Sequence, residues 1–295
     1  MQAEKTPRVR QPLCDLAIEA VFEDIAVKRA VFEALGRACR ADAILATNTS
    51  YLDPQAIAVG VPGPERFIGL HFFSPANVMK LLEIVPTPQT SQETLATGFA
   101  LAAKLGKVPV QAGICDGFIG NRILKRYRAA AEALLRRGAA IADVDAAMRA
   151  FGFAMGPFEA QDLGGLDIAY LQREGARSRG EAVAETLGDV LVRAGRKGQK
   201  TGGGWYDYAP GDRTPRASAA VAALLAPLVT AGPLPDDVAG HLVGEMAAEG
   251  EAILAEGIAA RPQDIDLVEI HGYGFPRRKG GPMHLAAARV TEPVA

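Results

Sequence analysis

Two apolar runs separated by a short loop, between residues 66 and 85, predict two neighbouring strands and their relative direction. "RFIGLHFF" is followed by "SPANVM" and then by "KLLEIV". A parallel crossover needs about a dozen residues or more, so a loop of this length joins antiparallel strands. A symmetric hairpin centred near Asn77 places His71 and Glu83 opposite each other, where cross-strand side chains touch. A bend in the loop would shift this register by one residue.

The flanking sequence predicts that the hairpin belongs to a larger, mainly parallel sheet. An apolar run around residues 15–21 leads into "DIAVKRAVFEALGRAC", which has helical periodicity and Asp24 as the expected N-cap. A strand in "DAILATNTS" and a short helix with Pro54 in its first turn come next. A helix through "SQETLATGFALAAKLG" and a strand "KVPVQA" follow the hairpin. This order favours a parallel sheet with covering helices.

The chain becomes helical after about residue 113 and contains two similar segments. "EALLRRGAAIADVD" at 132–145 resembles "EAILAEGIAARPQDID" at 251–266, and each is followed by a Gly-rich stretch ending in Gly-Pro. A Gly/Pro-rich loop or linker at 195–216 separates them. We interpret the two segments as related helical units.

The predicted fold class is α/β plus all-α, an incomplete Rossmann-type parallel sheet followed by a helical C-terminal domain with two related repeats. The predicted parts are a disordered lead at 1–13, the partial sheet domain at 14–112, the helical domain at 113–215 and the second repeat at 216–295.

The glycine-rich turn that binds pyrophosphate in dinucleotide enzymes is missing from this pattern. The fingerprint G-x-G-x-x-G would join the first strand to the first helix. "GYGFPR" lacks the third glycine, and "TGGGW" follows no strand-like run. Only 13 residues precede the first recognisable strand, whereas a βαβ unit needs about 30. We therefore expect the chain to lack the part that holds the pyrophosphate and adenosine of a dinucleotide.

Taken one by one, the polar residues also have ordinary structural interpretations. Hairpin geometry leaves His71 and Glu83 equally compatible with a general-base pair and with hydrogen-bonded core residues. Ser50 alone suits a turn or a helix cap, and Asn121 alone suits a helix start. A Ser50–His71–Glu83 hydrolase triad is disfavoured, because no G-x-S-x-G elbow surrounds the serine. Lys28 alone would lie on a solvated helix face.

Seven stretches in order resemble one enzyme family. They are "DLAIEAVFED", "AILATNTSYL", "GLHFFSPANVMKLLEIV", "DGFIGNRI", "MGPFEAQDLGGLDIAY", "GQKTGGGWYDY" and "DIDLVEIHGYGFPRRKGGPMH", which span residues 14 to about 290. The chain thus resembles the 3-hydroxyacyl-CoA dehydrogenase family, in particular the dehydrogenase half of bacterial and peroxisomal multifunctional β-oxidation enzymes. It departs from the family in lacking the first two strands, the glycine loop and the hydratase/isomerase half.

The resemblance implies NAD-dependent oxidation of an (S)-3-hydroxyacyl-CoA to a 3-ketoacyl-CoA. His71 matches the base that takes the hydroxyl proton, a task suited to a pKa near neutral. Glu83 matches the carboxylate that orients this imidazole. Ser50 and Asn121 match the groups that hold the reacting oxygen. The family's positions near ribose and nicotinamide correspond to Ala20, Glu23, Lys28, Asn48 and Lys200.

The resemblance and the bulk properties together define the expected partners and compartment. The formal net charge of −2 gives no general attraction to nucleic acid or to anionic membranes. The three cysteines fit neither a disulfide framework nor a metal site. The expected partners are an acyl-CoA substrate and either further copies of the chain or a β-oxidation partner, in the cytoplasm. The alternative is a catalytically weak remnant that acts as a binding or assembly subunit, and an uncovered sheet edge predicts self-association.

Overall fold

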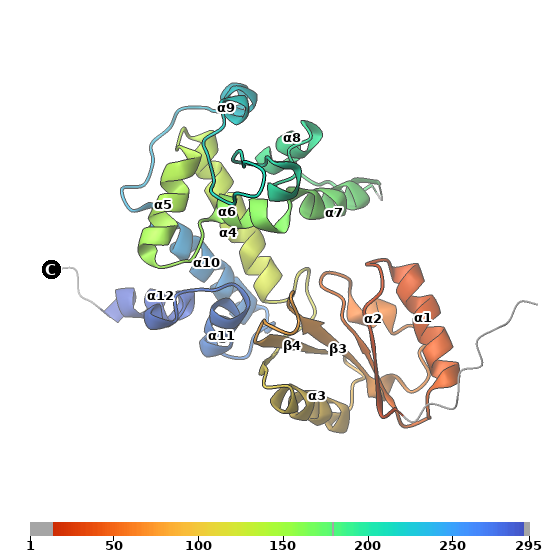
Figure 1. The fold of residues 1–295 in the computed structure, drawn as a ribbon. Helices are drawn as coiled ribbons and strands as arrows, with labels where there is room; N and C mark the ends of the chain where they lie inside the picture. Colours follow the sequence, from red (N-terminus) through yellow and green to blue (C-terminus); the bar gives the residue numbers. More distant parts are fainter. Residues whose placement is uncertain (1–13, 179, 292–295) are drawn as a thin grey trace, which may run out of the picture. The chain divides into compact units, whose positions relative to one another are not determined.

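The computed structural model of the protein describes residues 14–178 and 180–291 (Figure 1). The predicted lead at 1–13 lies outside these residues. By its internal contacts the chain divides into two compact units, of which unit 1 joins Met1–Ile123 to Ala247–Ala295 and unit 2 is Leu124–Met246. The domain boundaries predicted from the sequence stay predictions, because contact units need not follow related segments of the chain.

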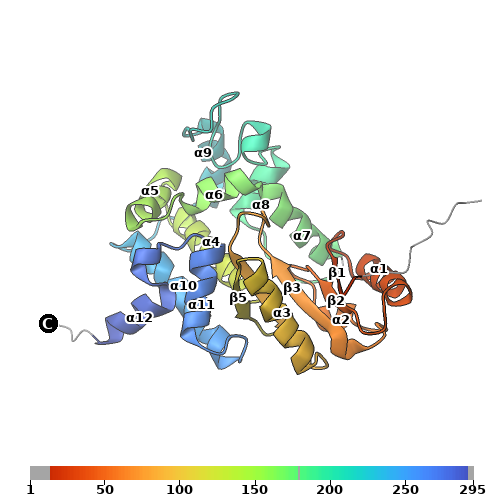
Figure 2. The same ribbon diagram turned by 60° about the horizontal axis from the view of Figure 1, so that its bottom comes forward.

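Unit 1 is built on a five-stranded sheet whose order follows the chain (Figure 2). Its strands are β1 (Leu16–Glu19), β2 (Ile44–Thr47), β3 (Phe67–Phe72), β4 (Leu81–Pro86) and β5 (Val108–Gln111). The pairs β1–β2, β2–β3 and β4–β5 are parallel, and β3–β4 is antiparallel. His71 is paired with Glu83 across β3 and β4, which confirms the predicted hairpin register.

Helices cover both faces of this sheet because successive strand residues point to opposite sides. Phe67 packs with Phe32 of α1 (Ile25–Ala38) and Ile57 of α2 (Pro54–Ile57). The next residue, Ile68, packs with Ala102 of α3 (Gln92–Lys104). A one-turn 3-10 helix, η1 (Pro64–Arg66), leads into β3. Both predicted helix starts are confirmed: the Asp24 side chain accepts from the Val27 N–H at 3.0 Å, and Pro54 opens α2.

The last part of the chain returns to the sheet of unit 1. It comprises the end of α10 (Val238–Ala255), α11 (Pro262–Gly272), the one-turn η4 (Arg277–Lys279) and α12 (Pro282–Thr291). Helix α11 contacts β4 and β5. Its last residue needs to be small, because a Cβ on Gly272 would lie 2.7 Å from Leu81 Cδ2. A segment far along the chain thereby covers the half of the sheet that carries Glu83.

Unit 2 is helical, and buried carboxylates in it accept hydrogen bonds from loop N–H groups. After α4 (Gly120–Arg136) its elements are α5 (Ile141–Phe151), α6 (Pro157–Gly164), α7 (Leu166–Ser178), α8 (Leu187–Arg193), η2 (Gln199–Thr201), α9 (Ala219–Leu225) and η3 (Ala226–Leu228). Asp162 accepts from the Trp205 and Tyr206 N–H groups at 2.8 and 3.0 Å. Burial raises the pKa of Asp162 to about 6 despite these donors.

The two similar sequence segments have the same local structure. Residues 132–145 span the end of α4, a turn and the start of α5, and residues 251–266 span the end of α10, a turn and the start of α11. Each turn contains a glycine with positive φ two residues after the helix, Gly138 at 101° and Gly257 at 71°. This shared turn supports the predicted repeat.

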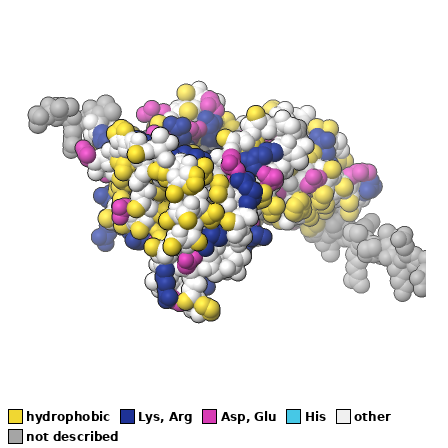
Figure 3. Space-filling model, turned by 90° about the horizontal axis from the view of Figure 1, so that it is seen from above, with side chains coloured by type: hydrophobic (Ala, Val, Ile, Leu, Met, Phe, Trp, Pro, Cys, Tyr) yellow, Lys and Arg dark blue, Asp and Glu magenta, His cyan; other side chains and the backbone are white. Residues whose placement is uncertain are grey.

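The molecular surface mixes charge signs on the face shown in Figure 3, where basic, acidic and apolar side chains alternate without a field of one sign. Among the helices of residues 14–178 and 180–291, none has both the length and the apolar character required to cross a bilayer.

Candidate active site

His71, near the carboxyl end of β3, and Glu83 of β4 form a buried hydrogen-bonded pair. The His71 Nδ1 atom lies 2.7 Å from Glu83 Oε2, and the two residues are 4% and 0% exposed. The other carboxylate oxygen, Oε1, accepts from the N–H groups of Ile119 at 3.2 Å and Gly120 at 3.0 Å. Backbone donors at the start of α4 thus hold Glu83 and favour its negative charge. The pair can orient an imidazole and stabilise its protonated form.

An unusual backbone turn presents those two N–H groups. Phe118 has a φ of 52° and follows Gly117, whose φ is 83°. Bulky residues rarely adopt positive φ, and such strain gathers at functional sites. The Phe118 ring is buried, and its centroid lies 5.7 Å from that of His71. Phe73 packs on His71 at 4.4 Å, so two aromatic rings enclose the imidazole.

The structure joins the loop after β2 to the start of α4 through Ser50 and Asn121. The Asn121 Nδ2 group donates to the Ser50 carbonyl oxygen at 3.3 Å. Asn121 directly follows Gly120, whose N–H donates to Glu83. Asn48 in the same loop accepts from the Phe72 N–H at 2.8 Å, next to His71. The four predicted catalytic residues therefore belong to one connected network in unit 1.

Tyr273 is a member of this network that the sequence interpretation missed. Its hydroxyl donates to Asn121 Oδ1 at 2.9 Å, although the two residues are 152 positions apart. The sequence contains "GYGFPR" as an incomplete glycine loop within a family-like stretch, and neither pattern indicated a role for the tyrosine. The sequence feature that could have indicated Tyr273 is its position at a predicted helix end with a glycine on each side.

Glu23 holds the loop that carries Ser50. Its Oε1 atom accepts from the Thr49 hydroxyl at 2.6 Å and from the N–H groups of Ser50 and Tyr51 at 2.8 and 3.0 Å. Burial acts to raise the pKa of Glu23, but these donors and Lys28 outweigh it and hold the pKa below its ordinary value. Glu23 thus shapes the end of the sheet where ligands bind in parallel folds.

Lys28 corrects the expectation of a solvated helix face, because it is only 1% exposed. Its Nζ atom lies 2.7 Å from Glu19 Oε1 and 3.2 Å from Glu23 Oε2. Glu19 also accepts from the Thr47 hydroxyl at 2.8 Å. In this arrangement Lys28 neutralises two carboxylates between β1 and α1.

The remaining predicted cofactor positions divide between the two units. Ala20 is exposed directly after β1, and half-buried Asn48 directly follows β2, so both lie at the carboxyl ends of parallel strands. Lys200 belongs to unit 2, where its Nζ donates to Asp167 Oδ2 at 2.8 Å. That hydrogen bond holds the pKa of Asp167 below its ordinary value.

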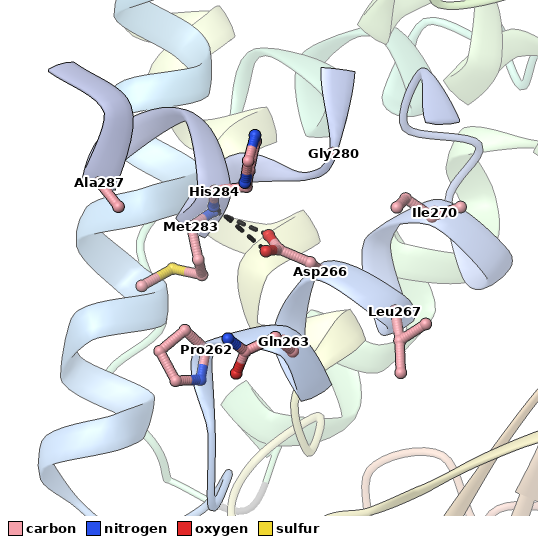
Figure 4. Close-up of a pocket in the computed structure, with 9 residues that line it drawn as sticks. All are labelled: Pro262, Gln263, Asp266, Leu267, Ile270, Gly280, Met283, His284 and Ala287. Carbon is pink, nitrogen blue, oxygen red and sulfur yellow. Dashed lines mark hydrogen bonds between the residues drawn. The ribbon is translucent and has the colours of Figure 1, made fainter. Parts of the chain in front are cut away.

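A surface hollow of about 410 Å³ in unit 1 contains none of these residues (Figure 4). It lies between α11 and α12, and its lining includes Leu267, Met283 and His284. Asp266 accepts from the Met283 and His284 N–H groups at 2.8 and 3.1 Å. These bonds cap the start of α12, a structural role.

Two family models match consecutive parts of the chain. Residues 5–115 match the description "3-hydroxyacyl-CoA dehydrogenase, NAD binding domain". Residues 117–208 match "3-hydroxyacyl-CoA dehydrogenase, C-terminal domain". His71, Glu83 and Ser50 lie within the first match, Asn121 lies near the start of the second, and Tyr273 lies outside both.

Similar proteins include longer enzymes. The peroxisomal bifunctional enzyme of Cavia porcellus is 42% identical over 297 residues, which cover 93% of this chain and 40% of the relative. The fatty acid oxidation complex subunit alpha of Shewanella sp. (strain MR-4) is 39% identical, over 92% of this chain and 39% of the relative. The chain thus spans about 40% of the length of these curated relatives.

Solved structures of separate dehydrogenases are also similar. The 3-hydroxybutyryl-CoA dehydrogenase of Escherichia coli superposes with a TM-score of 0.78 and 27% identity, over 94% of this chain and 75% of that chain. The (S)-3-hydroxybutyryl-CoA dehydrogenase of Ralstonia eutropha gives a TM-score of 0.60 and 32% identity, over 66% of this chain and 71% of that chain.

Proposed function

Since the chain belongs to the 3-hydroxyacyl-CoA dehydrogenase family, we propose that it oxidises an (S)-3-hydroxyacyl-CoA to the 3-ketoacyl-CoA with NAD as hydride acceptor. The observation that carries the proposal is the buried His71–Glu83 pair, with Nδ1 and Oε2 separated by 2.7 Å. A carboxylate on Nδ1 assigns the proton transfer to Nε2. This geometry supports His71 as the positioned base that the reaction requires.

In the proposed mechanism His71 takes the proton of the substrate's 3-hydroxyl through Nε2. Glu83 stabilises the resulting imidazolium, and two backbone N–H groups hold its other oxygen in place. The Ser50 hydroxyl and the Asn121 amide hydrogen-bond the same substrate oxygen and orient it toward His71. Positioning of this kind lowers the barrier by fixing the geometry of the reacting atoms.

The residues present fit one end of the cofactor. Ala20 and Asn48 follow two parallel strands at the end of the sheet where ligands bind. Glu23 holds the loop that carries Asn48 and Ser50, because its carboxylate accepts from the Ser50 N–H group. They would hold the ribose and nicotinamide, which supply the hydride acceptor. The printed sequence contains no G-x-G-x-x-G turn, so these residues account for the nicotinamide end alone. Lys200 stays a cofactor position that the family resemblance alone implies.

Partners and compartment belong to the same proposal. An acyl-CoA is the proposed substrate, and further copies of the chain or a β-oxidation partner are the proposed associates. The cytoplasmic location stays a prediction, since the similar proteins include both peroxisomal and bacterial enzymes.

The test is the reverse reaction, reduction of acetoacetyl-CoA by NADH, followed at the NADH absorbance with the purified chain. His71→Gln should lower kcat/KM by about 10²- to 10⁴-fold, the contribution usual for a positioned general base. His284→Gln is the matched control, because His284 is exposed in the hollow beside α12. Equal rates for the wild type and His71→Gln would contradict the assignment. A wild type without turnover would favour the binding or assembly subunit instead.

A further inference from the structure

The end of α11 brings an aromatic residue into the network around Asn121. Helix α11 ends at Gly272, and the Tyr273 N–H donates to the Glu269 carbonyl at 3.1 Å. Gly274 follows in the left-handed region, with a φ of 71°. Phe275 is 2% exposed, and its N–H also donates to Glu269 O, at 3.0 Å. Tyr273 is thus held by a defined helix end.

Two glycines provide the space for this approach. A Cβ on Gly120 would lie 2.4 Å from Tyr273 Cε2 and 2.9 Å from its hydroxyl oxygen. A Cβ on Gly272 would lie 2.7 Å from Leu81 Cδ2. These distances are too short for non-bonded contacts. Tyr273 can therefore approach the start of α4 because Gly120 lacks a side chain, and α11 can pack against Leu81 of β4 because Gly272 lacks one.

The contacts with Tyr273 and with the Ser50 carbonyl together fix which way the Asn121 amide faces. Tyr273 donates to Oδ1 at 2.9 Å, while Nδ2 donates to the Ser50 carbonyl at 3.3 Å. An asparagine amide has two donor hydrogens and one acceptor oxygen. Oδ1 accepts from the Tyr273 hydroxyl, and one Nδ2 hydrogen points to the Ser50 carbonyl. The second Nδ2 hydrogen can then donate to another acceptor. Rotation of the amide would place Oδ1 against the Ser50 carbonyl oxygen, where two acceptors would face each other.

We propose that Tyr273 is a positioning residue that holds the Asn121 amide with its N–H toward the oxygen of the reacting substrate. This inference rests on the proposed dehydrogenase function and adds to it a residue from the C-terminal segment of unit 1. Tyr273 acts through Asn121 because its hydroxyl donates to that side chain. Its ring also packs edge-on against Phe73 at 5.5 Å, and Phe73 lies on His71.

The kinetic test is a double-mutant cycle with Tyr273→Phe and Asn121→Ala in the full chain. Tyr273→Phe keeps the ring and removes one hydrogen bond, so kcat for acetoacetyl-CoA reduction should fall about three- to tenfold. The KM for acetoacetyl-CoA should change by less than about twofold, since the affected contact serves the reacting oxygen. In the Asn121→Ala background the same change should have no further effect, as coupling between contacting residues requires.

Additive effects in the cycle would overturn the proposal, because a merely structural role would lower kcat in both backgrounds. Tyr170→Phe provides the matched control: Tyr170 is half-buried in unit 2, and its substitution should leave kcat unchanged.

A second measurement tests the hydrogen bond between Tyr273 and Asn121 without requiring enzymatic turnover. The chain has three asparagines, Asn48, Asn77 and Asn121, so ¹⁵N-asparagine labelling gives few side-chain amide signals. Asn121→Ala identifies the Asn121 pair, and Tyr273→Phe should shift that pair alone. Unchanged Asn121 signals would overturn the positioning role. If the wild type has no turnover but these signals shift, the proposed function fails while the contact stands.

Discussion

The Lys28 ammonium is enclosed by two carboxylates, with Nζ 2.7 Å from Glu19 Oε1 and 3.2 Å from Glu23 Oε2. Both Lys28 and Glu19 are almost completely buried. Ions in such a place are stable only while they remain paired, because each has lost its hydration. Glu23 in turn holds the N–H groups of Ser50 and Tyr51, so the buried lysine supports the loop of the candidate active site.

Removing this ammonium should therefore destabilise unit 1. Lys28→Met leaves Glu19 as an uncompensated buried charge, and we expect the free energy of unfolding to fall by about 3 to 5 kcal/mol. Urea unfolding followed by circular dichroism measures this change. Lys104→Met, on the exposed end of α3, is the control and should shift stability by less than about 0.5 kcal/mol. A Lys28→Met chain as stable as the control would contradict this interpretation.

Glu269 is a buried carboxyl on α11 whose pKa should make stability depend on pH. Burial raises the pKa of Glu269 well above its ordinary value, and the nearby charge of Glu83 adds to the rise. The folded chain therefore keeps a proton that the unfolded chain releases above pH 4.5. Its contribution to stability is complete below that pH and is lost as the pH rises toward the folded pKa.

Glu269→Gln removes this titration while keeping a similar shape. The wild type should lose more stability than Glu269→Gln between about pH 5 and about pH 7. In this range the wild type must either take up a proton on Glu269 when it folds or bury the carboxylate charge, whereas glutamine does neither. Urea midpoints at the two pH values, measured for both chains, give the difference. Parallel pH dependences would show that Glu269 has an ordinary pKa.

At the scale of elements, helix α11 joins the end of the chain to the sheet. It packs against β4 and β5 through a surface where Gly272 meets Leu81. The same helix end carries Tyr273, so its position affects both packing and the network around Asn121. Stability and activity should therefore change together when this contact is altered.

Gly272→Ala tests that link. The added methyl group overpacks the contact, so we expect a loss of about 1 to 3 kcal/mol in unfolding free energy and a lower kcat. Gly244→Ala is the matched control, because a Cβ on this glycine of α10 meets nothing within 4 Å. The control should gain up to about 1 kcal/mol from its better helix propensity. Loss of stability in both variants would argue against the packing explanation.

The hairpin of β3 and β4 shows how far element prediction reached. Spacing along the chain placed His71 opposite Glu83, and the observed register confirms this. Such an inference succeeds because a short antiparallel connection leaves few alternative pairings. The partners of Glu23 were not predictable in this way, since Thr49, Ser50 and Tyr51 meet it through a contact between two separate loops.

At the scale of the whole molecule, β1 is an edge strand, which within residues 14–178 and 180–291 pairs only with β2. Large apolar side chains are exposed around it, among them Phe22 at 80% and Ile18 at 41%. Exposed edges with apolar side chains promote pairing between chains. We therefore expect self-association to occur through the β1 edge and the exposed apolar side chains around it.

We expect the average mass of the purified chain to rise with concentration in size-exclusion chromatography with light scattering. Ile18→Lys puts a charge on the edge strand and should reduce this association. Val59→Lys is the control, because Val59 is also exposed, at 64%, but lies after α2 rather than on the edge. A concentration-independent monomer would contradict the prediction.

The sequence by itself determined the α/β order, the hairpin and the pairing of His71 with Glu83, because these depend on periodicity and on distances along the chain. Only the tertiary structure decided that Lys28 is buried between two carboxylates and that Tyr273 reaches Asn121 across 152 positions. Those contacts depend on how separate elements pack, and hydrophobic periodicity specifies which face of a helix is buried but not which polar group it meets.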